Sequence, residues 1–245
     1  MYIGNKVTVL LPSAGSGTRM GGQTKKQYLQ LRGKEILRWT LEHFCQMPFW
    51  DELFVIVPPE DVKSVQEKVN DWFSKPLRKI VVIPGGVTRQ QSVFNGLNSA
   101  STNTDIVIVH DGVRPFLPIA KTIEALDKLV KTSTLQGVIA SVKITDTLKR
   151  VNTANIIEST IDRDSVWAVQ TPQIFKYASL LKAHRYAVEQ NLSVTDDAAL
   201  LEHVGHSVSI FESNRDNIKI TEPYDLTLAD IFLNQYIKED RKSVG

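Results

Sequence analysis

The chain has 245 residues, of which 42% are hydrophobic and 23% are charged, and its formal net charge is +2. These values are typical of a globular protein with a substantial core, and they argue against a nucleic-acid-binding protein, since no long run of Lys and Arg is present. The single cysteine, Cys45, excludes an intrachain disulfide, and no apolar run is long enough for a membrane span. No signal peptide is recognisable, so a cytoplasmic location is expected, with Cys45 in the core of a helix.

Short apolar runs alternate with helical patterns as far as Val142. Between these runs, apolar residues recur three and four positions apart, as in the segment from Val62 to Trp72. The alternation predicts an α/β fold with a Rossmann-like, mostly parallel sheet and helices on both faces. Ligands of such a sheet gather at the carboxyl ends of its strands. The predicted strands are Val7–Leu11, Leu53–Val57, Ile80–Ile83, Ile106–Val109 and Val138–Val142.

The pattern changes between about residues 143 and 167. Two extended segments joined by the polar turn Asn152–Asn155 predict a β-arm that projects from the sheet. Because such an arm leaves strand edges and an apolar face without partners, we expect it to build a homodimer. No repeat or low-complexity linker is present, so residues 1–245 are expected to form one domain with this arm. After the arm, the sequence predicts helices near Tyr177–Gln190 and Ala198–Val204, strands at Val208–Phe211 and Ile218–Thr221, and a last helix from behind Pro223 to about Ile237.

The first predicted strand leads into a glycine-rich segment, Pro12-Ser-Ala-Gly-Ser-Gly-Thr-Arg-Met20. Glycines let backbone N–H groups approach an anion, and Arg19, Lys25 and Lys26 add positive charge, which points to a nucleoside triphosphate. The segment matches neither common phosphate loop. Met20 stands where a dinucleotide-binding loop needs its third glycine, and Gln23 stands where a P-loop needs its lysine. An ordinary glycine-rich turn between strand and helix is the alternative interpretation.

A second motif follows the strand Ile106–Val109. Asp111 lies where a parallel strand delivers side chains to a ligand, and a single carboxylate suits Mg²⁺ shared with phosphate oxygens. Gly112 would leave room for a ribose, and Arg114 is suited to bind phosphate through two hydrogen bonds. The alternative is an aspartate that caps a turn. His110 is interpreted as a packing residue, because no second metal ligand is suitably spaced.

A third motif, Pro84-Gly-Gly-Val-Thr-Arg-Gln-Gln-Ser92, lies between a strand and a helix. Gly85 and Gly86 permit backbone hydrogen bonds to the edge of a base, and Ser92 offers a hydroxyl group. A plain helix entry explains the two glycines equally well. Only the position of the motif, at the end of another parallel strand, indicates a ligand.

Several other polar residues have a simple structural interpretation. Arg89 is compatible with an ordinary surface position, and acidic neighbours of Arg163 favour a solvated salt bridge. Lys219 lies between isoleucines and reads as a solvent-facing lysine on an edge strand. Thr171-Pro-Gln173 is typical of a turn, and Thr195-Asp-Asp197 is typical of a helix cap.

Taken in order, these motifs resemble the family of 2-C-methyl-D-erythritol 4-phosphate cytidylyltransferases, which act in the non-mevalonate isoprenoid pathway. The resemblance covers nearly the whole chain. The glycine-rich segment alone would indicate only the wider nucleotidyltransferase superfamily, whereas the later motifs are more specific. The matching motifs are P-x-A-G-x-G-x-R-M at 12–20, K-Q-Y-L at 26–29, G-G at 85–86, H-D-x-x-R-P at 110–115, D-T-L-K-R at 146–150, T-I-D-R at 160–163, Q-T-P-Q-I-F at 170–175, T-D-D-A at 195–198 and D-N-I-K-I-T at 216–221.

This resemblance implies a nucleotidyltransferase fold, an arm-mediated dimer, and Mg²⁺-dependent transfer of CMP from CTP to 2-C-methyl-D-erythritol 4-phosphate with release of pyrophosphate. Arg19 and Lys26 would contact the triphosphate, and Asp111 would hold the metal. The cytidine would be held by Ala14, Gly86, Ser92 and Gly112, with Gly15 and Gly17 in the nucleotide loop. The sugar phosphate would be positioned by Arg163 and Lys219, in a pocket lined by Arg114, Thr147, Thr171 and Thr195, some of them from the partner chain.

Three positions depart from the residues usual in that family: Lys25 replaces a proline, Val87 replaces an acidic residue and Gly112 replaces an alanine. Two alternative functions remain open. One is a ribitol-5-phosphate cytidylyltransferase, which shares the loop and the H-D-x-x-R-P motif but is disfavoured by T-I-D-R, Trp167 and T-D-D-A. The other is a catalytically silent sugar-nucleotide binding protein, which the set of cationic residues disfavours.

Overall fold

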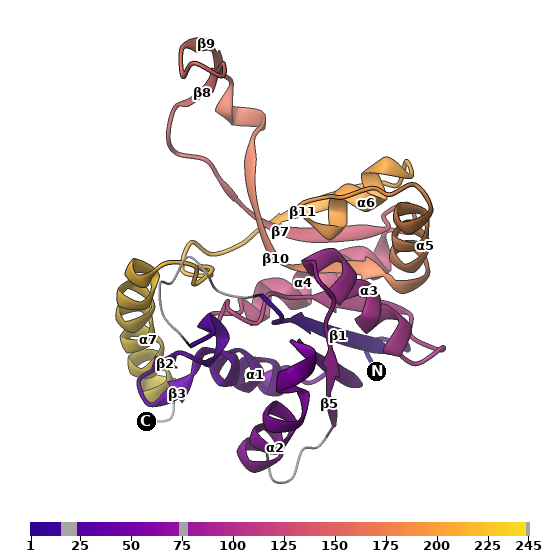
Figure 1. Ribbon diagram of the computed structural model, residues 1–245, viewed down its shortest axis with the longest axis vertical. Coiled ribbons are helices and arrows are strands. Elements are labelled where there is room, and N and C mark those ends of the chain that lie inside the picture. The colour runs from indigo at the N-terminus through magenta and orange to yellow at the C-terminus, as the bar shows by residue number, and fades with distance from the viewer. Residues whose placement is uncertain (16–23, 74–77, 244–245) are drawn as a thin grey trace.

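A computed structural model describes residues 1–15, 24–73 and 78–243, with 237–243 described by their backbone alone. The described residues form a seven-stranded sheet in the order β11-β7-β10-β6-β1-β4-β5 (Figure 1). Neighbouring strands run parallel, except that β10 is antiparallel to both β6 and β7. The expected mostly parallel α/β sheet is therefore confirmed. Its strands are β1 (Val7–Pro12), β4 (Glu52–Val57), β5 (Lys79–Pro84), β6 (Ile106–Val109), β7 (Gly137–Lys143), β10 (Trp167–Lys176) and β11 (Val208–Glu212).

Helices cover both faces of the sheet. Successive residues of a strand point to opposite faces, so each strand contributes apolar side chains to two separate clusters. Val9 and Leu11 of β1 join one buried cluster with helices α1 (Ile36–Gln46), α2 (Val62–Trp72) and α4 (Ile119–Lys131). Leu10, between them, joins a second cluster with α3 (Arg89–Ser99), α5 (Tyr177–Glu189) and α6 (Asp197–His203). The two clusters make the three-layer arrangement that leaves one edge of the sheet free for ligands.

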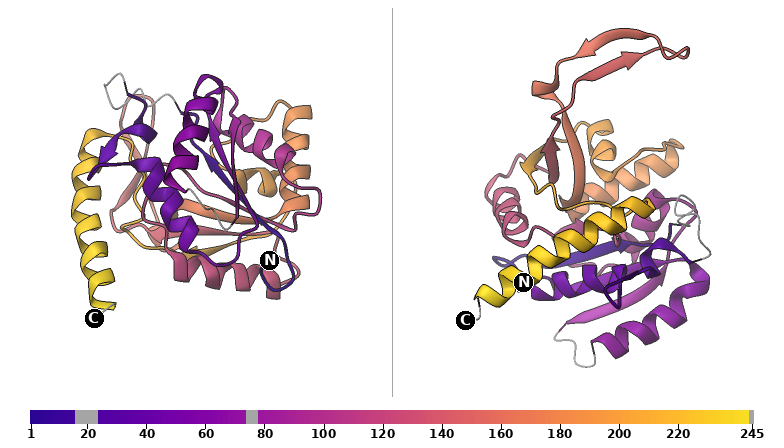
Figure 2. Two further views of the ribbon diagram at one scale, coloured as in Figure 1. Left: turned by 90° about the horizontal axis from the view of Figure 1, so that it is seen from below. Right: turned by 90° about the vertical axis from the view of Figure 1, so that its left-hand side faces the viewer.

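The C-terminal helix α7 (Pro223–Ser243) lies along the outside of the molecule (Figure 2). It packs near the short hairpin of β2 (Gln30–Leu31) and β3 (Lys34–Glu35), and a third cluster of buried residues joins these parts. Leu233 of α7 belongs to that cluster. No helix in the described part of the chain is both long and apolar enough to cross a membrane.

The predicted arm is present as the antiparallel pair β8 (Leu148–Val151) and β9 (Ile157–Ile161). It projects from the body of the molecule in both figures, between the end of β7 and the start of β10. Apolar side chains lie exposed on it, with Ile156 63% and Ile157 60% accessible.

Four details of the sequence prediction are wrong. Thr171 lies within β10, not in a turn; the sequence missed this strand because Pro172 interrupts it, and the pairing with β7 shifts register between Val169 and Gln173. Residues 218–221 form no strand, because their alternation comes from Ile220 packing beneath α7. Cys45 is exposed instead of filling the core. The last helix continues to Ser243.

Candidate active site

The carboxyl ends of β1, β5 and β6 meet at one edge of the sheet, beside a cavity of about 140 Å³. Many of the residues singled out in the sequence line it, although they come from distant parts of the chain. They are Ala14, Gly15, Lys26, Gly86, Ser92, Asp111 and Lys219. Gly17 and Arg19 lie outside the described residues. The structure therefore brings these seven predicted residues to one site.

The loop after β5 is tightly packed and has its N–H groups engaged. A Cβ added to Gly85 would lie 2.6 Å from Cβ of Ala14, and one added to Gly86 would lie 2.4 Å from Cβ of Gln91. Gly85 N–H donates to the carbonyl of Val57 (2.7 Å), and Gly86 N–H donates to Ser92 Oγ (3.1 Å). The Ser92 hydroxyl and these two N–H groups therefore hold the loop, and neither N–H group is left to donate to a base.

Asp111 is buried at the end of β6 and is surrounded by three cations. Its carboxylate lies 2.8 Å from Lys219 Nζ, 3.1 Å from Arg89 Nε and 3.6 Å from Arg114 Nε. Burial alone would raise the pKa of this carboxyl group, but the charges of Arg89, Lys219 and Arg114 outweigh it and hold the pKa far below the usual value. Asp111 is consequently ionised at neutral pH.

Lys219 is a correction to the expectation of a solvent-facing lysine, because its ammonium group pairs with Asp111. Its loop is held by Asn217, which is fully buried and which the sequence analysis did not single out. Asn217 Nδ2 donates to the carbonyl of Thr171 (2.7 Å), and Arg114 Nη1 donates to the carbonyl of Asn217 (2.7 Å). These bonds attach the Lys219 loop to β10 and to the turn that follows Asp111.

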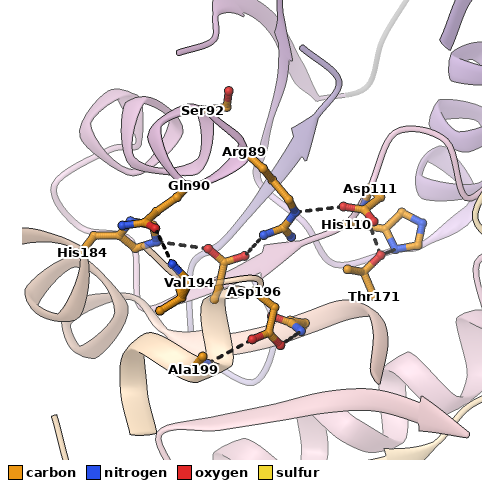
Figure 3. A network of polar contacts seen from close by, with 12 residues as sticks. Arg89, Gln90, Ser92, His110, Asp111, Thr171, His184, Val194, Asp196 and Ala199 are labelled. Atoms are coloured by element: carbon orange, nitrogen blue, oxygen red, sulfur yellow. Dashed lines mark hydrogen bonds and ion pairs between the residues drawn. The ribbon is translucent and has the colours of Figure 1, made fainter. Parts of the chain in front are cut away.

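Arg89 is the second correction, since it links Asp111 to a second buried carboxylate instead of lying free at the surface (Figure 3). Its Nη1 lies 2.6 Å from Asp197 Oδ2, and Asp197 is 1% exposed. Asp197 also contacts His184 Nε2 at 3.1 Å. The preceding Asp196 accepts a hydrogen bond from Ala199 N–H and so caps α6, as the sequence predicted. Of the two adjacent aspartates, one therefore caps a helix and the other binds an arginine.

A second cavity of about 310 Å³ adjoins the Asp111 cluster. Arg89, Asp111 and Lys219 line both cavities, so the two sites share one charged wall. Three of the residues predicted for the sugar phosphate lie around the second cavity: Arg114, Thr171 and Thr195. Two small-molecule sites that share a charged wall suit the joining of two phosphorylated compounds.

Thr147 and Arg163 are not brought to these cavities within the chain. Thr147 immediately precedes β8, and Arg163 follows β9, so both belong to the projecting arm. The Arg163 guanidinium donates a hydrogen bond to the carbonyl of Thr145 in the same arm. Neither residue lines either cavity in the described part of this chain.

His110 holds the turn that carries Asp111, as expected for a packing residue. Its Nε2 lies 3.0 Å from the carbonyl of Arg114, which only accepts, so Nε2 carries the proton. Its Nδ1 then accepts from the Thr171 hydroxyl (3.1 Å), whose oxygen accepts from Asp111 N–H (3.0 Å). The chain of donors and acceptors requires a neutral imidazole, and burial lowers the pKa of His110 to about 4.

We expect the buried imidazole to make the protein less stable as the pH falls from 6.5 toward 4. In that range the unfolded chain binds a proton that folded His110 excludes, which removes about 2 kcal/mol between pH 6.5 and 4.5. Urea unfolding at both pH values measures this loss. In His110→Gln, which does not titrate, the loss should shrink by that amount. An equal loss in both proteins would contradict a neutral, buried His110.

Gly112 lies against Ser13, so the space expected for a ribose is already taken on that side. A Cβ added to Gly112 would lie 1.9 Å from Ser13 Oγ and 3.2 Å from its Cβ. We therefore expect Gly112→Ala to lower the free energy of unfolding by about 1–2 kcal/mol. The double variant Ser13→Ala/Gly112→Ala should recover most of this loss. Chemical denaturation measures both, and a double variant no more stable than Gly112→Ala would show that the strain lies elsewhere.

Comparisons with known proteins agree with this geometry. The sequence model of the IspD family, 2-C-methyl-D-erythritol 4-phosphate cytidylyltransferase, matches residues 7–235. A relative of that name from Geotalea uraniireducens is 41% identical over 238 residues, covering 96% of this chain and 99% of its own length. The relative from Desulforamulus reducens is 39% identical, covering 95% of this chain and 97% of its own length.

Solved structures give the same result. The 2-C-methyl-D-erythritol 4-phosphate cytidylyltransferase of Francisella tularensis superimposes with a TM-score of 0.76 at 34% identity, covering 92% of this chain and 99% of that chain. The 4-diphosphocytidyl-2C-methyl-D-erythritol synthase of Anaerococcus prevotii superimposes with a TM-score of 0.83 at 27% identity, covering 95% of this chain and 98% of that chain. Similarity therefore extends over nearly the whole length in both sequence and structure.

Proposed function

Because the chain belongs to the 2-C-methyl-D-erythritol 4-phosphate cytidylyltransferase family, we propose that it transfers CMP from CTP to 2-C-methyl-D-erythritol 4-phosphate in the non-mevalonate isoprenoid pathway. A phosphate oxygen of the acceptor attacks the α-phosphorus of CTP. The new bond joins that oxygen to phosphorus, and the bond to the β-phosphate breaks to release pyrophosphate. The observation that carries this proposal is the charged wall of Arg89, Asp111 and Lys219, which lines both cavities.

The reaction needs charge stabilisation more than proton transfer. The attacking phosphate oxygen is already an anion, so no strong general base is required. The obstacles are the repulsion between two anions and the negative charge that grows on the leaving pyrophosphate. Two lysines would reduce this repulsion and stabilise the charge on the pyrophosphate: Lys26 in the first cavity and Lys219 in the shared wall. Fixed positions for the two substrates would supply much of the remaining acceleration.

We assign the first cavity to the nucleotide and the second to the sugar phosphate. The loop after β5 supports this choice, because the N–H groups of Gly85, Gly86 and Val87 already donate hydrogen bonds within the protein. The acceptors left in such a loop suit the amino group of cytosine and do not suit the carbonyl oxygen at the same position of uracil. CTP is therefore expected to be preferred over UTP.

Mg²⁺ fits the first cavity through Asp111, the acidic side chain among the described residues that line it. The carboxylate remains ionised, and Mg²⁺ needs few protein ligands when it also binds triphosphate oxygens. When bound, the metal would neutralise charge on the triphosphate. Lys219, whose side chain is 35% exposed, is the partner of Asp111 best able to move aside.

The arm is proposed to pair with that of a second copy of the chain. Its exposed apolar residues, including Ile156 and Ile157, gain a covered environment in a dimer. Thr147 and Arg163 would then be available to the acceptor cavity of the partner. We expect light scattering at micromolar concentration to give the mass of a dimer, and a monomer under these conditions would contradict the assignment.

Pyrophosphate release tests the proposed function. The assay combines CTP or UTP with 2-C-methyl-D-erythritol 4-phosphate or ribitol 5-phosphate, each with and without EDTA. Release only with CTP, the erythritol phosphate and free Mg²⁺ is expected. Faster release with ribitol 5-phosphate would assign the chain to the alternative reaction, and no release with any pair would indicate a binding protein.

A further inference from the structure

Lys26 stands on a turn too short to be stable by itself. The turn is a single 3₁₀ turn, Lys26–Tyr28, closed by hydrogen bonds from Tyr28 N–H to the carbonyl of Lys25 (2.9 Å) and from Leu29 N–H to the carbonyl of Lys26 (3.2 Å). Isolated turns of this kind are held weakly by their own backbone. The position of the Lys26 ammonium group must therefore be fixed by contacts elsewhere.

One carboxylate binds the turn on both sides of Lys26. Asp61 Oδ2 accepts from Lys25 Nζ (2.7 Å) and from the Tyr28 hydroxyl (2.9 Å). Lys25 Nζ also lies 2.6 Å from Glu60 Oε1. Glu60 and Asp61 belong to the short helical turn Pro59–Asp61 that follows β4, so these contacts attach the Lys26 turn to the central sheet.

The rest of the turn is packed against the same region. Gln27 is 1% exposed, and the Lys68 ammonium group lies 5.1 Å from the centre of the Tyr28 ring. Burial, with the hydrogen bond to Asp61 next, raises the pKa of the Tyr28 hydroxyl, which therefore stays a donor to Asp61. The turn has its neighbours fixed on both sides while the Lys26 side chain faces the cavity beside Gly15.

We propose that Asp61 is a positioning residue for Lys26: by holding Lys25 and Tyr28 together, it sets where the Lys26 ammonium group meets the triphosphate. The proposal rests on the proposed function, because it assigns Lys26 a role in the reaction. Asp61 lines neither cavity. Its side chain is 20% exposed and that of Lys25 is 27% exposed, so the ion pair is partly buried and its removal also costs some stability. The effect of Asp61 on catalysis is therefore measured with variants whose melting temperatures show them to be folded.

A double-mutant cycle with Lys26 separates positioning from a general structural effect. Asp61→Ala is expected to lower kcat about tenfold in the natural sequence, because a small displacement of a charged group sharply reduces its effect. In the Lys26→Ala background the same substitution should change kcat by less than about twofold, because the group that Asp61 positions is gone. Asp230→Ala serves as a control for the loss of an ion pair, since it removes a more exposed pair with Arg32 and neither residue lines either cavity.

Three results would overturn or redirect the inference. Normal turnover of Asp61→Ala, or an equal loss in both backgrounds, would contradict a positioning role. A loss of similar size in the Asp230→Ala control would also contradict it, by showing that losing an ion pair away from the cavities has the same effect. Normal turnover of Lys26→Ala would instead count against the proposed role of Lys26 itself, so the two failures are distinguishable.

Discussion

Lys26→Ala is expected to lower kcat about a hundredfold while the protein stays folded. The side chain lines the first cavity and lies next to Gly15, where a Cβ would be 3.9 Å from its Cε. An ammonium group placed on the triphosphate stabilises charge that develops as pyrophosphate leaves, and such a group contributes about 3 kcal/mol to the transition state. Steady-state kinetics with CTP and the acceptor measure the loss.

The matched control for this experiment is Lys34→Ala. Lys34 is a lysine that forms an ion pair with Glu42, but it lies in the β2–β3 hairpin and lines neither cavity. Its removal should leave kcat unchanged. Circular dichroism and the melting temperature establish that both variants are folded. Near-normal turnover of Lys26→Ala would remove this residue from the mechanism.

The loops that form the site could be predicted from the sequence because the topology of a parallel sheet places them. Ala14, Gly86 and Asp111 each follow a short apolar run, and the carboxyl ends of neighbouring parallel strands lie at one edge. Short continuous apolar runs identified those strands without knowledge of their order. The local sequence was therefore sufficient to bring three separate motifs to one site.

The ion pairs of Arg89 and Lys219 with buried carboxylates could not be predicted in the same way. Arg89 follows a helix cap and looks like any polar residue in a first turn, and its partner Asp197 lies far away in the sequence. Lys219 was misplaced because Ile218 and Ile220 alternate with it, as in an edge strand. That alternation instead reflects Ile220 packing under α7, and the loop is held by Asn217. Such pairings are tertiary and leave no periodic signal.

One sequence signal for Arg89 was present. Thr195-Asp-Asp197 offers more carboxylates than a single helix cap uses, and Asp196 makes the cap. The second carboxylate begins a helix with a buried face, so it needed a cation or a proton. Asking which partner each acidic residue requires would have shown that Asp197 needs a cation from a distant part of the chain.

Arg89→Gln is expected to destabilise the protein by about 3 kcal/mol at pH 7, because it leaves the buried Asp197 carboxylate without its cation. For a chain of this size, the melting temperature should fall by roughly 6–12 °C. Turnover should also fall, by about tenfold or more, because Arg89 fixes Asp111 in the wall shared by the two cavities. Arg89→Lys, which keeps the charge, should lose less stability and less turnover than Arg89→Gln.

The pH dependence of that destabilisation distinguishes a charge effect from a packing effect. Burial alone would raise the pKa of Asp197, but Arg89 and His184 hold it below the usual value. The stabilisation is therefore present above the unfolded pKa, near 4, and is lost as pH falls through the lower folded pKa. In Arg89→Gln the pKa of Asp197 rises, so urea unfolding should show the largest deficit at pH 7 and a much smaller one near pH 4. His110 titrates in both proteins, so its contribution cancels when the free energies of unfolding of the two proteins are subtracted. A deficit of constant size across this range would mean that the arginine acts through packing alone.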